Sequence, residues 1–171
     1  THFSQVMHTL RAITGCYGKV ETVCDLIEDS KSKGALVFVW YKSLAVDIAV
    51  ALRRRGLDAE IVDGEIPIEE RVERAHKHRF IVATISALSE GIDLSRMDTV
   101  IFAEEHWPPG SAIQAMRRVR RDRQSREANQ RPVTIAHVHV AGTIDETIHA
   151  VAAQRTATIR DVVSGALGLL D

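Results

Sequence analysis

The chain has 171 residues, 45% of them hydrophobic, which is enough for one domain with a sizeable core. The formal net charge of −1 excludes a uniformly basic nucleic-acid-binding protein, although arginines crowd one segment of the C-terminal half. No apolar run approaches the roughly 18 residues of a membrane span, and two cysteines without a C-x-x-C pair suggest a reducing cytosolic setting.

The first third of the chain reads as a helix, a buried strand and a second helix. Residues 1–18 are mixed in composition, and we expect them to lead in from a missing upstream lobe. From Lys19, apolar residues recur with helical spacing. A-L-V-F-V-W at 35–40 is a continuous apolar run, typical of a strand buried on both faces of a parallel sheet. The next helix has an apolar face at Leu44, Ile48, Ala51 and Leu52, Ser43 can cap it, and Gly56 stands where it should end.

Shorter apolar runs alternate with helical patterns along the rest of the chain. Further strands are expected at 59–62, 81–84, 99–104 and 133–140. A polar helix should cover about 67–77, and the capping-box sequence T-I-D-E at 143–146 should open a last long helix. This alternation predicts βαβ units wound into a mostly parallel sheet, an α/β class with a single domain over 1–171.

An arginine-rich stretch at 114–124, Q-A-M-R-R-V-R-R-D-R-Q, predicts a helix with one polar and one apolar face. The polar positions at i, i+3, i+4 and i+7 are Gln114, Arg117, Arg118 and Arg121. A guanidinium is always charged and matches phosphate oxygens bidentately, so this face suits a nucleotide polyphosphate or a nucleic-acid backbone. A solvated basic face is the alternative interpretation.

Loops that follow the strands are the expected places for ligands, because parallel sheets bind ligands beyond their carboxyl ends. The loop at 85–94 offers hydroxyls, a glycine at Gly91 for close backbone approach, and Asp93, which can accept from a ribose hydroxyl. E-H-W-P-P at 105–109 leads into the arginine stretch. Trp107 in it is either a base-stacking platform or a packing residue.

Three other patterns give weaker signals. Gly18 and Lys19 do not complete the phosphate-loop motif G-x-x-x-x-G-K-[ST]. The H-x-H pairs at 76–78 and 137–139 have no cysteine or carboxylate partner at metal-ligand spacing, so we expect no metal site. The three arginines at 53–55 stand at the C-terminus of a predicted helix. They either interact favourably with the helix dipole there or contact DNA.

Taken in order, the motifs resemble the second RecA-like lobe of a superfamily 2 helicase, most closely the Swi/Snf-related DNA translocases, including bacterial and phage members. The matching stretches are V-F-V-W-Y-K-S, V-D-G followed by E-R, S-E-G-I-D-L, E-x-x-W-P-P, the arginine stretch and G-T-I-D-E. They span about residues 15–155. The resemblance implies a RecA-like three-layer fold, with helices flanking a central, mostly parallel sheet.

The resemblance also implies a function, that of the C-terminal motor lobe of an ATP-dependent DNA translocase. The implied cofactor is ATP with Mg²⁺, bound against an N-terminal RecA-like lobe that holds the magnesium ligands, so the isolated domain should be inactive. DNA, duplex rather than single-stranded, is the implied partner, in a bacterial cytoplasm at the nucleoid or during phage infection and away from membranes. The alternatives are an RNA-directed or strand-separating superfamily 2 helicase and a non-catalytic nucleic-acid-binding module.

Individual roles follow from the same resemblance. Arg121 matches the arginine finger, and Arg118 matches a companion arginine that also reaches the phosphates. Gln114 begins the motif and would orient the nucleotide or the arginines. The residues expected at the nucleotide are Glu90, Gly91 and Asp93. Those expected at the nucleic acid are Lys42, Thr84, Ser86, Trp107 and Arg117.

Several positions depart from the family pattern. Arg117 stands where relatives commonly have glycine or aspartate, and it either contacts DNA or projects into solvent. The loop from Thr84 to Asp93 is one residue longer than the common form, which leaves the position of Thr84 in its motif open. Pro108 replaces a usual asparagine.

Overall fold

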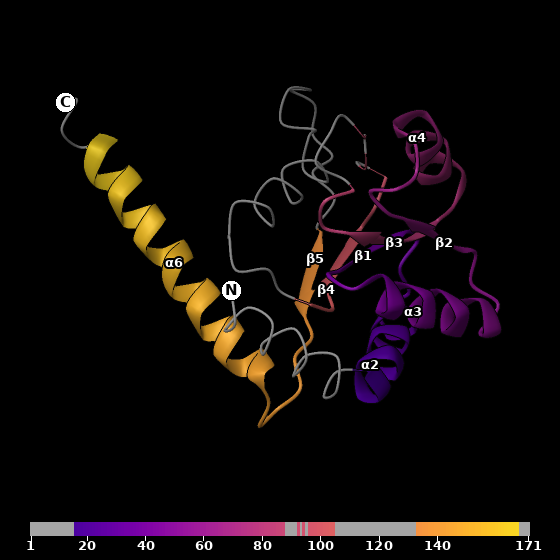
Figure 1. The fold of residues 1–171 in the computed structure, drawn as a ribbon, viewed down its shortest axis with the longest axis horizontal. Helices are drawn as coiled ribbons and strands as arrows, with labels where there is room; N and C mark the ends of the chain where they lie inside the picture. Colours follow the sequence, from indigo (N-terminus) through magenta and orange to yellow (C-terminus); the bar gives the residue numbers. More distant parts are fainter. Residues whose placement is uncertain (1–15, 88–91, 93, 95, 105–132, 168–171) are drawn as a thin grey trace.

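The computed structural model describes residues 16–87, 92, 94, 96–104 and 133–167 (Figure 1). Five parallel strands form one sheet in the spatial order β2-β3-β1-β4-β5. The strands are β1 (Ala35–Val39), β2 (Ala59–Val62), β3 (Phe80–Thr84), β4 (Thr99–Phe102) and β5 (Thr134–His137). This parallel sheet confirms the predicted α/β class.

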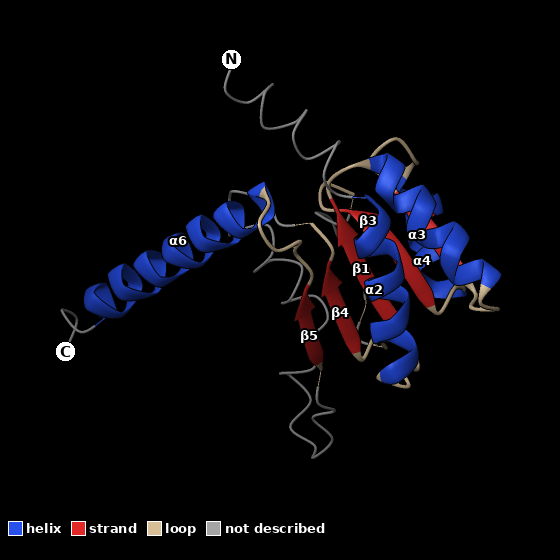
Figure 2. Ribbon diagram, turned by 90° about the horizontal axis from the view of Figure 1, so that it is seen from below, coloured by secondary structure: helices blue, strands red, loops and turns tan. Residues whose placement is uncertain are grey.

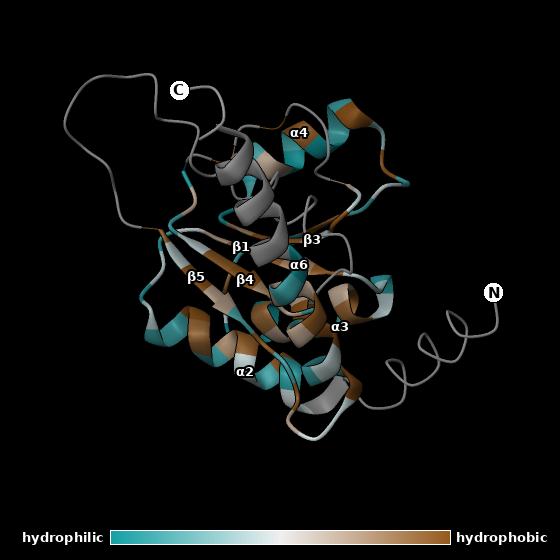
Figure 3. Ribbon diagram, turned by 90° about the vertical axis from the view of Figure 1, so that its left-hand side faces the viewer, coloured by the Kyte–Doolittle hydropathy of each residue, from teal (hydrophilic) through white to brown (hydrophobic). Residues whose placement is uncertain are grey.

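Helices complete the layers on both faces of the sheet. The described helices are α2 (Cys16–Asp29), α3 (Lys42–Arg54), α4 (Ile68–Lys77) and α6 (Ile144–Leu167). Figure 2 shows α2 and α3 together on one face, and Figure 3 shows α4 on the other. The helix α6 extends away from the sheet in Figures 1 and 2. None of the described helices is long and apolar enough to cross a lipid bilayer.

The core is centred on β1, whose residues are all fully buried. Val37 and Val39 join the apolar cluster under α2 and α3, whereas Leu36 and Phe38 join the cluster under α4. Successive side chains of a strand point to opposite faces, so a strand covered on both sides needs apolar residues at every position. The hydrophobic colouring of the strands in Figure 3 reflects this two-sided burial.

The helix α3 has the predicted apolar face but not the predicted cap. The buried positions Leu44, Ile48 and Leu52 share one side of the helix. The prediction that Ser43 caps it is wrong, because the helix begins at Lys42, so Ser43 lies inside its first turn, and the N-cap residue Tyr41 makes no side-chain cap. The first turn of α3 therefore begins only two residues after β1, at the carboxyl edge of the sheet.

Two strands are shorter than their apolar patterns. The strand β4 ends at Phe102 rather than at residue 104, and β5 covers 134–137 rather than 133–140. Val138 lies outside β5, yet it is buried and its N–H donates to the Phe102 oxygen at 2.9 Å. Apolar character follows burial, which continues past the point where regular strand pairing ends.

The start of α6 is tied to α2 by a buried ion pair. Thr143, in the predicted capping sequence, accepts the N–H of Asp145 on its hydroxyl at 3.3 Å. The Asp145 carboxylate accepts the N–H of Val140 at 3.3 Å and lies 2.6 Å from the Lys19 ammonium. Both charged side chains are buried, so each depends on the other for compensation.

Candidate functional site

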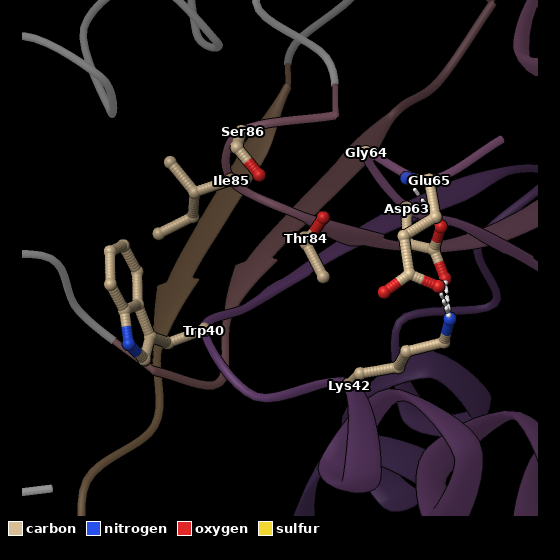
Figure 4. A pocket seen from close by; sticks show the side chains of 8 residues that line it. All are labelled: Trp40, Lys42, Asp63, Gly64, Glu65, Thr84, Ile85 and Ser86. Carbon is tan, nitrogen blue, oxygen red and sulfur yellow. Dashed lines mark hydrogen bonds and ion pairs between the residues drawn. The ribbon is translucent and has the colours of Figure 1, made fainter. Parts of the chain in front are cut away.

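An open pocket of about 270 Å³ lies where the carboxyl ends of β1, β2 and β3 meet (Figure 4). Trp40 and Lys42 reach it after β1, residues 63–65 after β2, and residues 84–86 from the end of β3. Ligands of parallel sheets bind beyond this edge. The fold thus brings together three residues that the sequence nominated for one site, Lys42, Thr84 and Ser86.

Lys42 supplies the positive charge of the pocket. Its ammonium lies 2.8 Å from the Asp63 carboxylate and 2.6 Å from the Glu65 carboxylate. These hydrogen bonds raise the pKa of Lys42. Burial acts to raise the pKa of Asp63, but the Lys42 ammonium and the backbone N–H of Glu65 together lower this pKa below its ordinary value. The pocket therefore holds a cation between two carboxylates.

The pocket also contains two hydroxyl groups, those of Thr84 and Ser86. Thr84 is only 9% exposed, and its buried Oγ1 has no hydrogen-bond partner among the described residues. Burying an unsatisfied hydroxyl costs about 1–3 kcal/mol, so such groups call for an explanation. Ser86, two residues further on, is exposed. Two hydroxyls and an ammonium are donors suited to the oxygens of an anion such as a phosphate.

Two side chains that sequence reasoning did not assign to the site hold its loops in place. Glu104, buried two residues after β4, accepts the backbone N–H groups of Trp40 at 2.7 Å and Tyr41 at 2.9 Å through one carboxylate oxygen. Arg71 on α4 donates from Nε to the Ile66 oxygen and from Nη1 to the Ala87 oxygen, each at 2.7 Å. Arg71 therefore joins the loop after β2 to the loop after β3.

The remaining predicted site residues lie outside the described residues. This applies to Glu90, Gly91, Asp93, Trp107, Gln114, Arg117, Arg118 and Arg121. Ile92 and Leu94, which alternate with two of these positions, are described and fully buried. The motif S-E-G-I-D-L is thus attached to the core through its apolar residues.

Two basic patterns have structural partners in the fold. Lys19 is buried against Asp145 rather than placed in a phosphate loop, as its incomplete motif indicated. Arg53 donates to the Ala59 oxygen at 2.8 Å. Arg55 pairs with acidic residues of α2, including Asp25 at 2.7 Å. For these two arginines the structure favours an internal role over a DNA contact.

The two H-x-H pairs lie in different parts of the fold. His76 is exposed on α4. The rings of His137 and His139 lie 5.8 Å and 4.9 Å from the ring of His149 on α6, measured between centroids. In the part of the chain that the structure describes, no group of three or more histidine, cysteine, aspartate or glutamate residues could hold a metal ion.

Comparison with known proteins adds a family to this geometry. The model of the helicase conserved C-terminal domain matches residues 18–123. A SWI/SNF-related matrix-associated actin-dependent regulator of chromatin, subfamily A-like protein 1, from Xenopus laevis is 32% identical over 133 residues, covering 74% of this chain and 13% of that protein. The chromatin-remodeling ATPase INO80 of Gibberella zeae is 30% identical over 157 residues, covering 86% of this chain and 8% of that protein.

Solved structures share the fold. The C-terminal part of the Fun30 ATPase domain superposes with a TM-score of 0.66 at 20% identity, covering 79% of this chain and 45% of that one. The Pyrococcus furiosus Hef helicase domain gives a TM-score of 0.57 at 22% identity, covering 78% and 28% of the two chains. The RecA-like helicase-lobe architecture is thus confirmed. The chain spans only about a tenth of the length of the two curated relatives described above.

Proposed function

This chain belongs to the helicase conserved C-terminal domain family of superfamily 2, and we propose that it is the C-terminal motor lobe of an ATP-dependent DNA translocase. One observation carries the proposal: a single family match over residues 18–123 includes both the pocket at the sheet edge and most of the arginine stretch. The proposed lobe has two tasks, to hold the DNA backbone and to complete an ATP site.

The DNA-binding task is proposed for the pocket. Lys42 offers a charged donor, Thr84 a buried hydroxyl without a partner among the described residues, and Ser86 an exposed hydroxyl. Phosphate contacts of this kind position a protein on nucleic acid without reading its sequence. This suits a motor that must move along any sequence. Trp107 and Arg117 are proposed as further contacts, on the sequence pattern alone.

The ATP-binding task is proposed for the arginine stretch. Arg121 would stabilise charge on the transferring γ-phosphoryl group, with Arg118 beside it and Gln114 orienting the nucleotide or the arginines. Such an arginine is worth about 10³–10⁵ in rate. Glu90, Gly91 and Asp93 are proposed at the nucleotide sugar. Support comes from the residue pattern and from the family match, which includes all six positions.

An upstream RecA-like lobe is the proposed partner within the same protein. It would supply the phosphate loop and the Mg²⁺ ligands, because Gly18 and Lys19 do not form a phosphate loop and Lys19 is buried against Asp145. ATP would therefore bind between two lobes. The 171-residue chain alone is expected to have no ATPase activity.

Duplex DNA is the proposed track. The two relatives are named for chromatin regulation and remodelling, and chromatin DNA is double-stranded. Those relatives come from a frog and a fungus, so the bacterial or phage origin indicated by the motif pattern stays a prediction.

The test is the ATPase rate of the complete protein without nucleic acid and with duplex DNA, single-stranded DNA or RNA. Stimulation by duplex DNA well above the other two supports the translocase. A preference for RNA or for single strands would instead identify an RNA-directed or strand-separating helicase. No turnover under any condition, with DNA still bound, would identify a non-catalytic binding module.

A further inference from the structure

The Lys42 ammonium is held by two carboxylates of different character (Figure 4). The Asp63 side chain is 7% exposed and lies 2.8 Å away, whereas the Glu65 side chain is 81% exposed and lies 2.6 Å away. An ammonium has three N–H donors, so these two acceptors use most of its bonding capacity. A phosphate oxygen that approaches Lys42 must bind beside them or displace one.

Asp63 is a fixed part of this arrangement. Its carboxylate also accepts the backbone N–H of Glu65 at 3.0 Å, and removing the lysine from it would leave a buried charge uncompensated. Asp63 therefore keeps the Lys42 ammonium in the pocket whether or not a ligand is present.

Glu65 is the partner that can leave. Its side chain is long and exposed, and its ion pair with Lys42 joins two solvent-accessible groups. Pairs of this kind contribute little net stability, because water solvates both charges and two flexible side chains must be immobilised. The same carboxylate would repel a phosphate bound at Lys42, which carries the same sign of charge.

We propose that Glu65 is a built-in competitor of the DNA phosphate for Lys42, so that binding each phosphate requires this carboxylate to move aside. The inference rests on the proposed function, since it needs Lys42 to be a DNA contact. Glu65 then lowers the affinity of the pocket and speeds release of the phosphate. A motor that releases its track at every step needs a contact of this reversible kind.

Duplex-DNA affinity of the complete protein, measured by fluorescence anisotropy at several salt concentrations, tests the proposal. Glu65→Gln keeps the shape of the side chain and removes its charge. Asp29→Asn makes the same change of charge at the exposed end of α2, before β1 begins and so at the opposite edge of the sheet. Lys42→Gln removes the cation and keeps an amide that can donate to Asp63, and the melting temperature of the variant shows whether the fold is retained.

Glu65→Gln should bind duplex DNA about 2- to 5-fold more tightly, the range expected for one exposed charge pair. Asp29→Asn should bind as the wild type does. Lys42→Gln should bind more weakly. The slope of log affinity against log salt concentration should become shallower by the amount that corresponds to about one phosphate contact. In the Lys42→Gln background, Glu65→Gln should have no further effect, because the competition needs the cation.

The possible failures can be told apart. Unchanged affinity in Glu65→Gln, together with weaker binding in Lys42→Gln, would overturn the competitor and leave the DNA-binding pocket intact. An equal gain from Glu65→Gln with and without Lys42 would also overturn it, since the gain would then be a general charge effect. Unchanged affinity in Lys42→Gln, with a wild-type melting temperature, would remove the pocket from the proposed function and the competitor with it.

Discussion

Replacing Thr84 with valine should stabilise the fold, although most buried substitutions destabilise. Valine keeps the β-branched shape and removes the Oγ1 atom, which is buried without a partner among the described residues. Thr84 ends a strand paired with β1, where valine is well suited to the pleated surface. The substitution thus removes a cost from the folded state and leaves the apolar packing in place.

The expected gain follows from the cost of the unsatisfied hydroxyl. That cost is about 1–3 kcal/mol, and imperfect packing of the new methyl group offsets part of it. We expect a net gain of about 1 kcal/mol, or roughly 2–4 °C in melting temperature for a domain of this size. Urea unfolding of the 171-residue chain, followed by circular dichroism, measures the free energy directly.

Thr99→Val is the matched control. Thr99 is also buried, on the strand at the other side of β1, but its hydroxyl donates to the Asp98 carboxylate at 3.0 Å. The same chemical change there breaks a hydrogen bond to a charged group and should destabilise by about 1 kcal/mol or more. If Thr84→Val destabilises the chain as Thr99→Val does, the Thr84 hydroxyl has a partner in the folded protein. The proposal that this hydroxyl contacts a DNA phosphate would then lose its support.

The first of three further predictions rests on the sequence resemblance, and the other two rest on the structure. Arg121→Ala in the complete protein should reduce DNA-stimulated ATPase by about 10³-fold or more with an unchanged melting temperature, and wild-type turnover would remove the finger assignment. The lowered pKa of Asp63 means that its carboxylate stabilises the fold above the unfolded-state pKa and that this stability is lost as pH falls through the folded-state pKa. The difference in unfolding free energy between wild type and Asp63→Asn should therefore shrink between pH 5 and pH 2 in urea titrations, and a constant difference would contradict the linkage. Lys19→Met should cost about 3–5 kcal/mol because it removes the cation that compensates the buried Asp145 carboxylate, and adding Asp145→Leu should recover part of that loss, as chemical denaturation of both variants can show.

Local patterns were enough to predict the architecture. The run at 35–40 indicated two-sided burial, and β1 has it, because the alternation of strand side chains makes that environment visible in the sequence. The helix α3 likewise has its predicted apolar face. The predicted strand ends at 104 and 140 were too late because apolar residues continue past the paired segment.

Contacts between distant segments were not predictable in this way. Glu104 holds the turn after β1 from 63 and 64 residues away, and Arg71 reaches across to Ala87. No periodicity in the sequence records such a bond. The helix start at Lys42 was missed for the same reason, because the turn before it is held by the Glu104 carboxylate and not by a nearby serine.

The candidate site was predictable in part. The motif order and the rule that ligands bind at strand ends predicted nucleic-acid contacts at Lys42, Thr84 and Ser86. The fold places these three residues around one pocket. The carboxylates of Asp63 and Glu65 on Lys42 were not foreseen. They come from a loop more than twenty residues further along the chain, and only the parallel packing of β1, β3 and β2 brings it there.

The central claim is a division of labour, in which the pocket holds DNA and the arginine stretch acts on ATP. The most direct test is the ATPase rate of the complete protein as duplex DNA is titrated, for wild type and Lys42→Gln. The account predicts that Lys42→Gln raises the DNA concentration for half-maximal stimulation and leaves the maximal rate unchanged. An unchanged half-maximal concentration, or a maximal rate lost at saturating DNA, would contradict it.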